Sequence, residues 1–147
     1  MKKIIEKRTD IRATPDQVWE VLTRDDLTRQ WYAVFSEGTY AETDWQPGSK
    51  VTFLDKSQCG IVGHIATAEK PSRLVIEYDG QIMNGAEDYT SDMALQMKDV
   101  QESYTLTEQD GLTRLSVTLD MPGEYYDMMN GQWDTAMEKI CSLAEML

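Results

Sequence analysis

The chain has few of the residues that build metal centres and disulfide frameworks. Its 147 residues include two cysteines, Cys59 and Cys141, and one histidine, His64. A structural zinc site takes about four Cys or His ligands at short spacings, and the two cysteines lie far apart without a CxxC pair. We therefore expect no metal site, no cofactor, and two free thiols in a reducing cytoplasm.

Basic residues are also scarce: 14 Lys and Arg stand against 26 Asp and Glu, and the net charge is −12. Nucleic acids and anionic membrane surfaces are bound through basic patches. No apolar run approaches the ~20 residues of a membrane span, and the N-terminal lysines precede no apolar run of a secretory signal. The sequence predicts a cytoplasmic protein with no nucleic-acid and no membrane partner, folded as a single domain over residues 1–147.

Helix signals lie near the start and at the end of the chain. In ATPDQVWEVL, Thr14 caps a helix, Pro15 fits the first helical position and Gln17 completes a capping box. A second short helix follows, with Thr23 as its expected cap. At the C-terminus, apolar residues recur with a period near 3.6, which predicts a long helix that begins between residues 124 and 132.

Strand signals dominate the middle of the chain. Runs such as KVTFLD, GIVGHIATAE and LVIEYDG are separated by turn-forming residues. Residues 100–119 predict a hairpin about Asp110-Gly111, and the opening IIEKRTDIRA predicts an edge strand. The order of elements predicts an α+β fold in which a curved antiparallel sheet of six or seven strands wraps around the long C-terminal helix, with two short helices after the first strand. A helix about 10 Å wide leaves space within such a concavity, where a ligand pocket would form.

Six segments of the chain, in this order, resemble those of one known superfamily. They are ATPDQVWEVLT, the turn WQPGSKVTF, the strands GIVGHI, KPSRLV and GLTRLSV, and a Trp that opens the last helix. The set resembles the START-like, helix-grip superfamily (SRPBCC), in the branch related to the heat-shock-protein ATPase activator. Residues 81–99 depart from the pattern, because this link is longer than usual; its three methionines would suit a lid, a dimer contact or a loop.

The resemblance implies a cavity between sheet and helix that holds hydrophobic or amphipathic small molecules. Some relatives are polyketide cyclases or aromatases, some bind lipids or hormones, and one group stimulates a chaperone ATPase. We expect the cavity wall to be aromatic and apolar, with one histidine. The predicted ligand-binding residues are Trp31, Phe35, Phe53, His64, Tyr78, Tyr104, Trp133 and Met137.

Each of these residues also has a purely structural interpretation. Aromatic rings bury 150–250 Å² each and are ordinary core residues. His64 is either a polar anchor for a ligand or a hydrogen-bonded histidine on the sheet. The strand carboxylates of Asp44, Glu77 and Glu102 are expected to face water, although one that faced inward would have a raised pKa.

The leading functional prediction is a non-catalytic protein that binds a small apolar or aromatic molecule. No Ser, Cys or Asp lies at a spacing that would make it a nucleophile beside His64, so no catalytic residue is predicted. One alternative is a protein-interaction module of the chaperone-activator type, with a homodimer or a chaperone as partner. The other is a cyclase-type or aromatase-type enzyme, which needs two acid–base groups that converge in the cavity.

Overall fold

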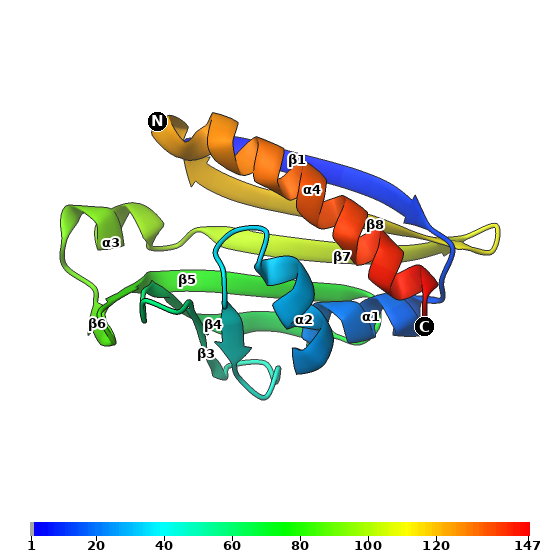
Figure 1. Cartoon of the computed structure of the whole chain (residues 1–147), viewed down its shortest axis with the longest axis horizontal. Helices are drawn as coiled ribbons and strands as arrows, with labels where there is room; N and C mark the ends of the chain where they lie inside the picture. Colours follow the sequence, from blue (N-terminus) through cyan, green and yellow to red (C-terminus); the bar gives the residue numbers. More distant parts are fainter. Residues whose placement is uncertain (1) are drawn as a thin grey trace.

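An antiparallel sheet of eight strands curves around a long C-terminal helix in the computed structural model, which describes residues 2–147 (Figure 1). The strands are ordered β1-β8-β7-β5-β4-β3-β2, and β6 pairs with β5 off this path. The strand bounds are β1 Lys2–Ile11, β2 Tyr40–Glu42, β3 Lys50–Leu54, β4 Gly60–Glu69, β5 Arg73–Met83, β6 Ala86–Asp88, β7 Gln101–Gln109 and β8 Leu112–Pro122.

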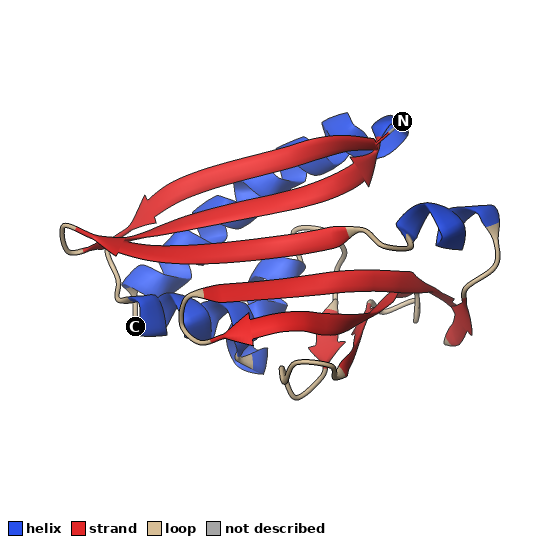
Figure 2. Cartoon of the chain, turned by 180° about the vertical axis from the view of Figure 1, so that it is seen from behind, coloured by secondary structure: helices blue, strands red, loops and turns tan. Residues whose placement is uncertain are grey.

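The helices α1, α2 and α4 cover one face of the sheet, and the opposite face is open when the molecule is seen from behind (Figure 2). None of the helices among residues 2–147 combines the length and the apolarity that crossing a bilayer requires. A short 3-10 turn leads into α4. The helix bounds are α1 Pro15–Thr23, α2 Asp25–Tyr32, α3 Asp92–Met97, η1 Gly123–Tyr125 and α4 Tyr126–Glu145.

The helix pair after β1 forms largely for the expected reasons. The Thr14 hydroxyl accepts from the backbone N–H of Gln17, and the Gln17 side chain accepts from the backbone N–H of Thr14, so the capping box is complete. The prediction that Thr23 caps α2 is wrong. Its hydroxyl donates to the carbonyl of Trp19 at 2.8 Å within α1, and Arg24 occupies the cap position without a side-chain bond.

The sheet has one more strand than the largest number expected. The missed strands, β2 and β6, have three residues each, which is too short for an alternating pattern to be recognised. Residues 81–99 form the end of β5, β6 and α3. The predicted hairpin is present: Asp110 and Gly111 both have positive φ, as a two-residue turn of this kind requires.

Two glycines allow β4 to approach its neighbours closely. A Cβ at Gly60 would lie 1.6 Å from the carbonyl oxygen of Phe53 on β3, and one at Gly63 would lie 2.3 Å from that of Glu77 on β5. The register of β4 against β5 also shifts beside Gly63. Close approach and bulges of this kind increase the curvature of a sheet. The concave side of the sheet therefore encloses space next to Phe53 and Tyr78.

Candidate ligand-binding site

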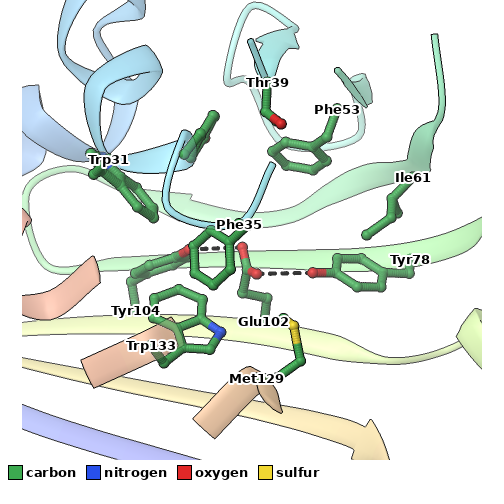
Figure 3. A pocket seen from close by; sticks show the side chains of 11 residues that line it. Trp31, Phe35, Thr39, Phe53, Ile61, Tyr78, Glu102, Tyr104, Met129 and Trp133 are labelled. Carbon is green, nitrogen blue, oxygen red and sulfur yellow. Dashed lines mark hydrogen bonds between the residues drawn. The ribbon is translucent and has the colours of Figure 1, made fainter. Parts of the chain in front are cut away.

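A cavity of about 130 Å³ lies between the concave face of the sheet, α2 and α4 (Figure 3). Five of its wall residues come from strands, namely one each from β3, β4 and β5 and two from β7; the others come from α2, the loop after it and α4. Seven of the eleven wall residues are aromatic. The wall is formed by Trp31, Tyr32, Phe35, Thr39, Phe53, Ile61, Tyr78, Glu102, Tyr104, Met129 and Trp133.

The aromatic rings of the wall pack against one another rather than lying separately. The centre of the Trp133 ring is 5.0 Å from that of Phe35, 6.1 Å from that of Trp31 and 6.2 Å from that of Tyr104. Trp31 also meets Tyr104 edge to face. Ring pairs at such distances add about 0.5–1.5 kcal/mol each beyond the area that they bury. The wall is therefore a connected cluster that holds its own shape.

One carboxyl group, that of Glu102, lies within this aromatic wall and is buried. The hydroxyl of Tyr78 donates to Oε1 of Glu102 at 2.9 Å, and the hydroxyl of Tyr104 donates to Oε2 at 2.7 Å (Figure 3). Burial raises the pKa of Glu102 above its ordinary value, and the two hydroxyl donors oppose that rise. The folded protein thus holds the Glu102 proton to a higher pH than the unfolded chain does.

The tyrosine hydroxyls beside Glu102 remain protonated. Burial, and then the nearby Glu102 carboxylate, raise the pKa values of Tyr32, Tyr78 and Tyr104 well above their ordinary value. A phenol in this environment donates a hydrogen bond and does not act as a base near neutral pH.

The two tryptophans of the wall differ in how their indole N–H groups are satisfied. Nε1 of Trp31 donates to the carbonyl of Val21 at 2.9 Å. Within residues 2–147, Nε1 of Trp133 is buried and has no hydrogen-bond partner. The side chain of Trp133 is only 2% exposed, so this donor is shielded from bulk water.

The structure brings together six of the eight predicted ligand-binding residues. These six, which all lie in the cavity wall, are Trp31, Phe35, Phe53, Tyr78, Tyr104 and Trp133. Their role in binding stays a prediction, because a wall residue of the cavity is also a residue of the core.

His64 does not lie in the cavity wall, contrary to the expectation. It pairs with Glu77, and the next residue, Tyr78, points into the cavity, so strand alternation places His64 on the open face of the sheet. Its Nδ1 is 3.0 Å from Oδ2 of Asp79, and its Nε2 is 3.2 Å from Oε2 of Glu77. These carboxylates, Asp79 above all, raise the pKa of His64.

Met137 is also placed outside the cavity. It is buried one helical turn beyond Trp133 and lies beside Lys7 and Thr9 of β1. The spacing of four residues puts both side chains on one face of α4, but the rise of about 6 Å carries Met137 past the end of the cavity.

Sequence reasoning missed five residues of the wall. Glu102 was expected to face water. However, it lies two residues before Tyr104, so both side chains are on the same face of β7, and this spacing was a usable signal. Met129 is four residues before Trp133, which was a similar signal on α4. Tyr32 lies between Trp31 and Phe35 in a cluster of three aromatic residues, which was also a signal, whereas nothing in the local sequence marked Thr39 and Ile61 as wall residues.

Comparison with known proteins identifies the family and the fold. A model of the family described as Activator of Hsp90 ATPase homolog 1-like protein matches residues 12–145. A search of curated proteins finds no match.

Three similar solved structures come from bacteria. The Aha1 dimer from Colwellia psychrerythraea is 15% identical, with a TM-score of 0.74 over 97% of this chain and 96% of that one. CalU16 from Micromonospora echinospora is 18% identical, with a TM-score of 0.69 over 97% and 76%. MLL2253 from Mesorhizobium loti is 13% identical, with a TM-score of 0.75 over 98% of both chains. At identities this low the TM-scores establish a common fold and nothing more, and this fold confirms the predicted helix-grip architecture. The match to the family model establishes that the chain belongs to the Activator of Hsp90 ATPase homolog 1-like family.

Proposed function

We propose that this protein binds a small apolar or aromatic molecule, about the size of a single ring, in the cavity between the sheet and α4. The observation that carries the proposal is an aromatic cavity of about 130 Å³ that the packed side chains leave open. An engineered cavity of about 150 Å³ lined by apolar side chains is large enough to bind benzene. Burial of apolar surface supplies the affinity, at roughly 25 cal/mol per Å² before the entropic cost of association.

Binding is favoured over catalysis by the chemistry of the wall. The wall holds one carboxyl group and no histidine among the described residues. Acid–base enzymes use groups whose pKa values are set apart on either side of neutrality, and the tyrosines here stay protonated. A cyclase-type enzyme would therefore have to rely on Glu102 for both proton removal and proton return.

The proposal is tested by thermal unfolding of the purified protein with a panel of single-ring probes at millimolar concentration. A probe at 100 times its Kd stabilises the native state by about 2.7 kcal/mol, which corresponds to a Tm increase of roughly 5–10 °C for a domain of this size. Native mass spectrometry of the freshly purified protein would show a molecule retained in the cavity.

A matched pair of variants locates the site. Ile61→Phe adds a ring at the cavity wall, whereas Ile4→Phe makes the same change at a residue that is 62% exposed. We expect the first variant to lose most of the probe-induced Tm shift and the second to retain it. The proposal would be refuted if no probe raised the Tm of the parent protein and the native mass spectrum showed the protein without any bound molecule.

A second candidate function is contact with a protein partner. It is supported by the family description and by the Aha1 neighbour, which was solved as a dimer. Large apolar side chains are also exposed at the α3 end of the molecule, among them Met83, Tyr89 and Leu95. The test is the ATPase rate of a purified Hsp90 chaperone with and without this protein, with light scattering to determine whether the protein is a dimer. An unchanged ATPase rate would exclude the chaperone as a partner, and a monomeric mass would exclude the homodimer.

A further inference from the structure

The unpartnered indole N–H of Trp133 calls for a hydrogen-bond acceptor that the described residues do not supply. Trp133 lies in the cavity wall, and its ring is almost fully buried. Figure 3 shows the indole nitrogen on the side of the ring that faces Met129 and Glu102. Buried donors are nearly always paired in native proteins, so an N–H group of the cavity wall that lacks a protein partner points to an acceptor on a bound molecule.

The other polar groups of the cavity are rich in acceptor capacity. Each oxygen of Glu102 takes one tyrosine hydroxyl, at 2.9 Å and 2.7 Å, although a carboxylate offers about four lone-pair positions. Among residues 2–147, no lysine or arginine belongs to the wall. The cavity therefore offers one donor without a partner among the described residues, and remaining acceptor capacity at Glu102, within a wall that is otherwise largely apolar.

This arrangement affects anionic, cationic and neutral ligands differently. An anion would meet the buried Glu102 carboxyl without any cation to compensate it. An ammonium group would be attracted by the Glu102 carboxyl, but it has no lone pair, so it would leave the N–H of Trp133 unpaired and would face the positive end of that dipole. A neutral hydroxyl differs from both, because its oxygen accepts and its hydrogen is donated.

We propose that the ligand of this cavity is a phenol or a short aromatic alcohol, whose hydroxyl oxygen accepts a hydrogen bond from Nε1 of Trp133 and whose hydrogen is donated to the acceptors around Glu102. The proposal rests on the proposed function, since it specifies the ligand of the same site. The aromatic ring of the ligand packs against the rings of the wall, and its hydroxyl group selects it from other ring-sized molecules.

The experiment compares phenol with toluene, which differ in little except the exchange of a hydroxyl for a methyl group. Transfer of an unpaired hydroxyl into an apolar site costs enough to weaken binding by roughly 5- to 100-fold. We expect phenol to bind at least as tightly as toluene in isothermal titration. Benzoate and benzylamine should bind more weakly than phenol.

Two tryptophan variants assign the effect to one N–H group. Trp133→Phe removes the free donor, and Trp31→Phe makes the same change in the same wall at a donor already bonded to Val21. We expect Trp133→Phe to shift the ratio of the two affinities toward toluene by roughly 3- to 10-fold, and Trp31→Phe to leave it unchanged. The ratio cancels any change in cavity volume that both probes feel.

A measurement on the unmodified protein does not depend on the folding of a variant. Phenol should move the Hε1 resonance of Trp133 downfield in a proton–nitrogen NMR spectrum, and toluene should not produce this hydrogen-bond shift. If toluene binds and phenol binds far more weakly without that shift, the hydroxyl proposal is overturned and the proposed function stands. If neither probe nor any other ring-sized molecule binds, both are overturned.

Discussion

Removal of the Trp133 side chain in two steps tests how its burial and its unpaired donor contribute to stability. Trp133→Ala removes the whole indole, and Trp133→Phe keeps one ring but removes the N–H. A buried indole of about 200 Å² contributes roughly 5 kcal/mol at 25 cal/mol per Å², in line with the 3–5 kcal/mol that aromatic-to-alanine changes usually cost. The unpaired N–H that is removed with it had cost about 1–3 kcal/mol.

The two contributions have opposite signs, so the variants should differ strongly. We expect Trp133→Ala to lower the free energy of unfolding by about 3 kcal/mol, because the loss of packing against Phe35, Trp31 and Tyr104 exceeds the relief at the donor. Trp133→Phe should stay within about 1 kcal/mol of the parent protein, because relief of the buried donor offsets the smaller loss of ring area.

Urea denaturation followed by circular dichroism measures both free energies. Without ligand, a Trp133→Phe variant that lost as much stability as Trp133→Ala would show that the N–H is satisfied in the native state. That result would refute the reasoning about the unpaired donor, and with it the basis for a hydroxyl ligand. A Trp133→Ala variant close to the parent protein would show instead that the indole is not a central packing residue.

Three further predictions concern charge and close packing. Because Glu102 holds its proton more tightly in the folded protein than in the unfolded chain, the free energy of unfolding of the parent protein should fall as pH rises above 4.5. Urea denaturation at pH 4–8 should show the stability of Glu102→Gln increasing relative to that of the parent protein. A difference in stability that stays constant with pH would contradict the raised pKa. The contribution of His64 to the free energy of unfolding should be complete below pH 6.5 and lost as pH rises through its raised pKa. Asp79→Asn should lower the pKa of His64 in an NMR titration of this histidine, and an unchanged pKa would exclude the pairing of His64 with Asp79. Gly60→Ala should lower the free energy of unfolding by about 1–3 kcal/mol, because the new Cβ would overlap the β3 backbone. Gly131→Ala should raise it by about 0.5–1 kcal/mol, because Gly131 lies within α4 and has open space around it. Equal Tm values for the two variants would refute both predictions.

Local signals in the sequence were sufficient for most of the elements. The capping box at Thr14 and Gln17, the Asp110-Gly111 turn and the apolar period of the last helix each depend on residues within a few positions of one another. Signals of this kind can be recognised in the sequence without knowledge of the fold. The cap assigned to Thr23 failed because its hydroxyl has another local partner, the Trp19 carbonyl, to which it donates within α1, and a pattern alone does not rank the two.

The site required the tertiary structure because its residues come from six separate elements and the loop after α2. Alternation along β7 relates Glu102 to Tyr104, but the meeting of Glu102 with Tyr78 depends on the pairing of β5 with β7. The register of β4 against β5 likewise placed His64 on the open face, where Asp79 and Glu77 hold it.

The sequence by itself determined that this chain forms a curved antiparallel sheet closed by one long helix, and that aromatic side chains face the space between them. Periodicity and turn chemistry are local properties, so they can be read from the order of residues. Only the tertiary structure decided that a buried carboxyl and an unpaired indole N–H share that space. Burial and hydrogen-bond satisfaction depend on residues that are distant in the sequence, and they become defined only when the strands and helices pack.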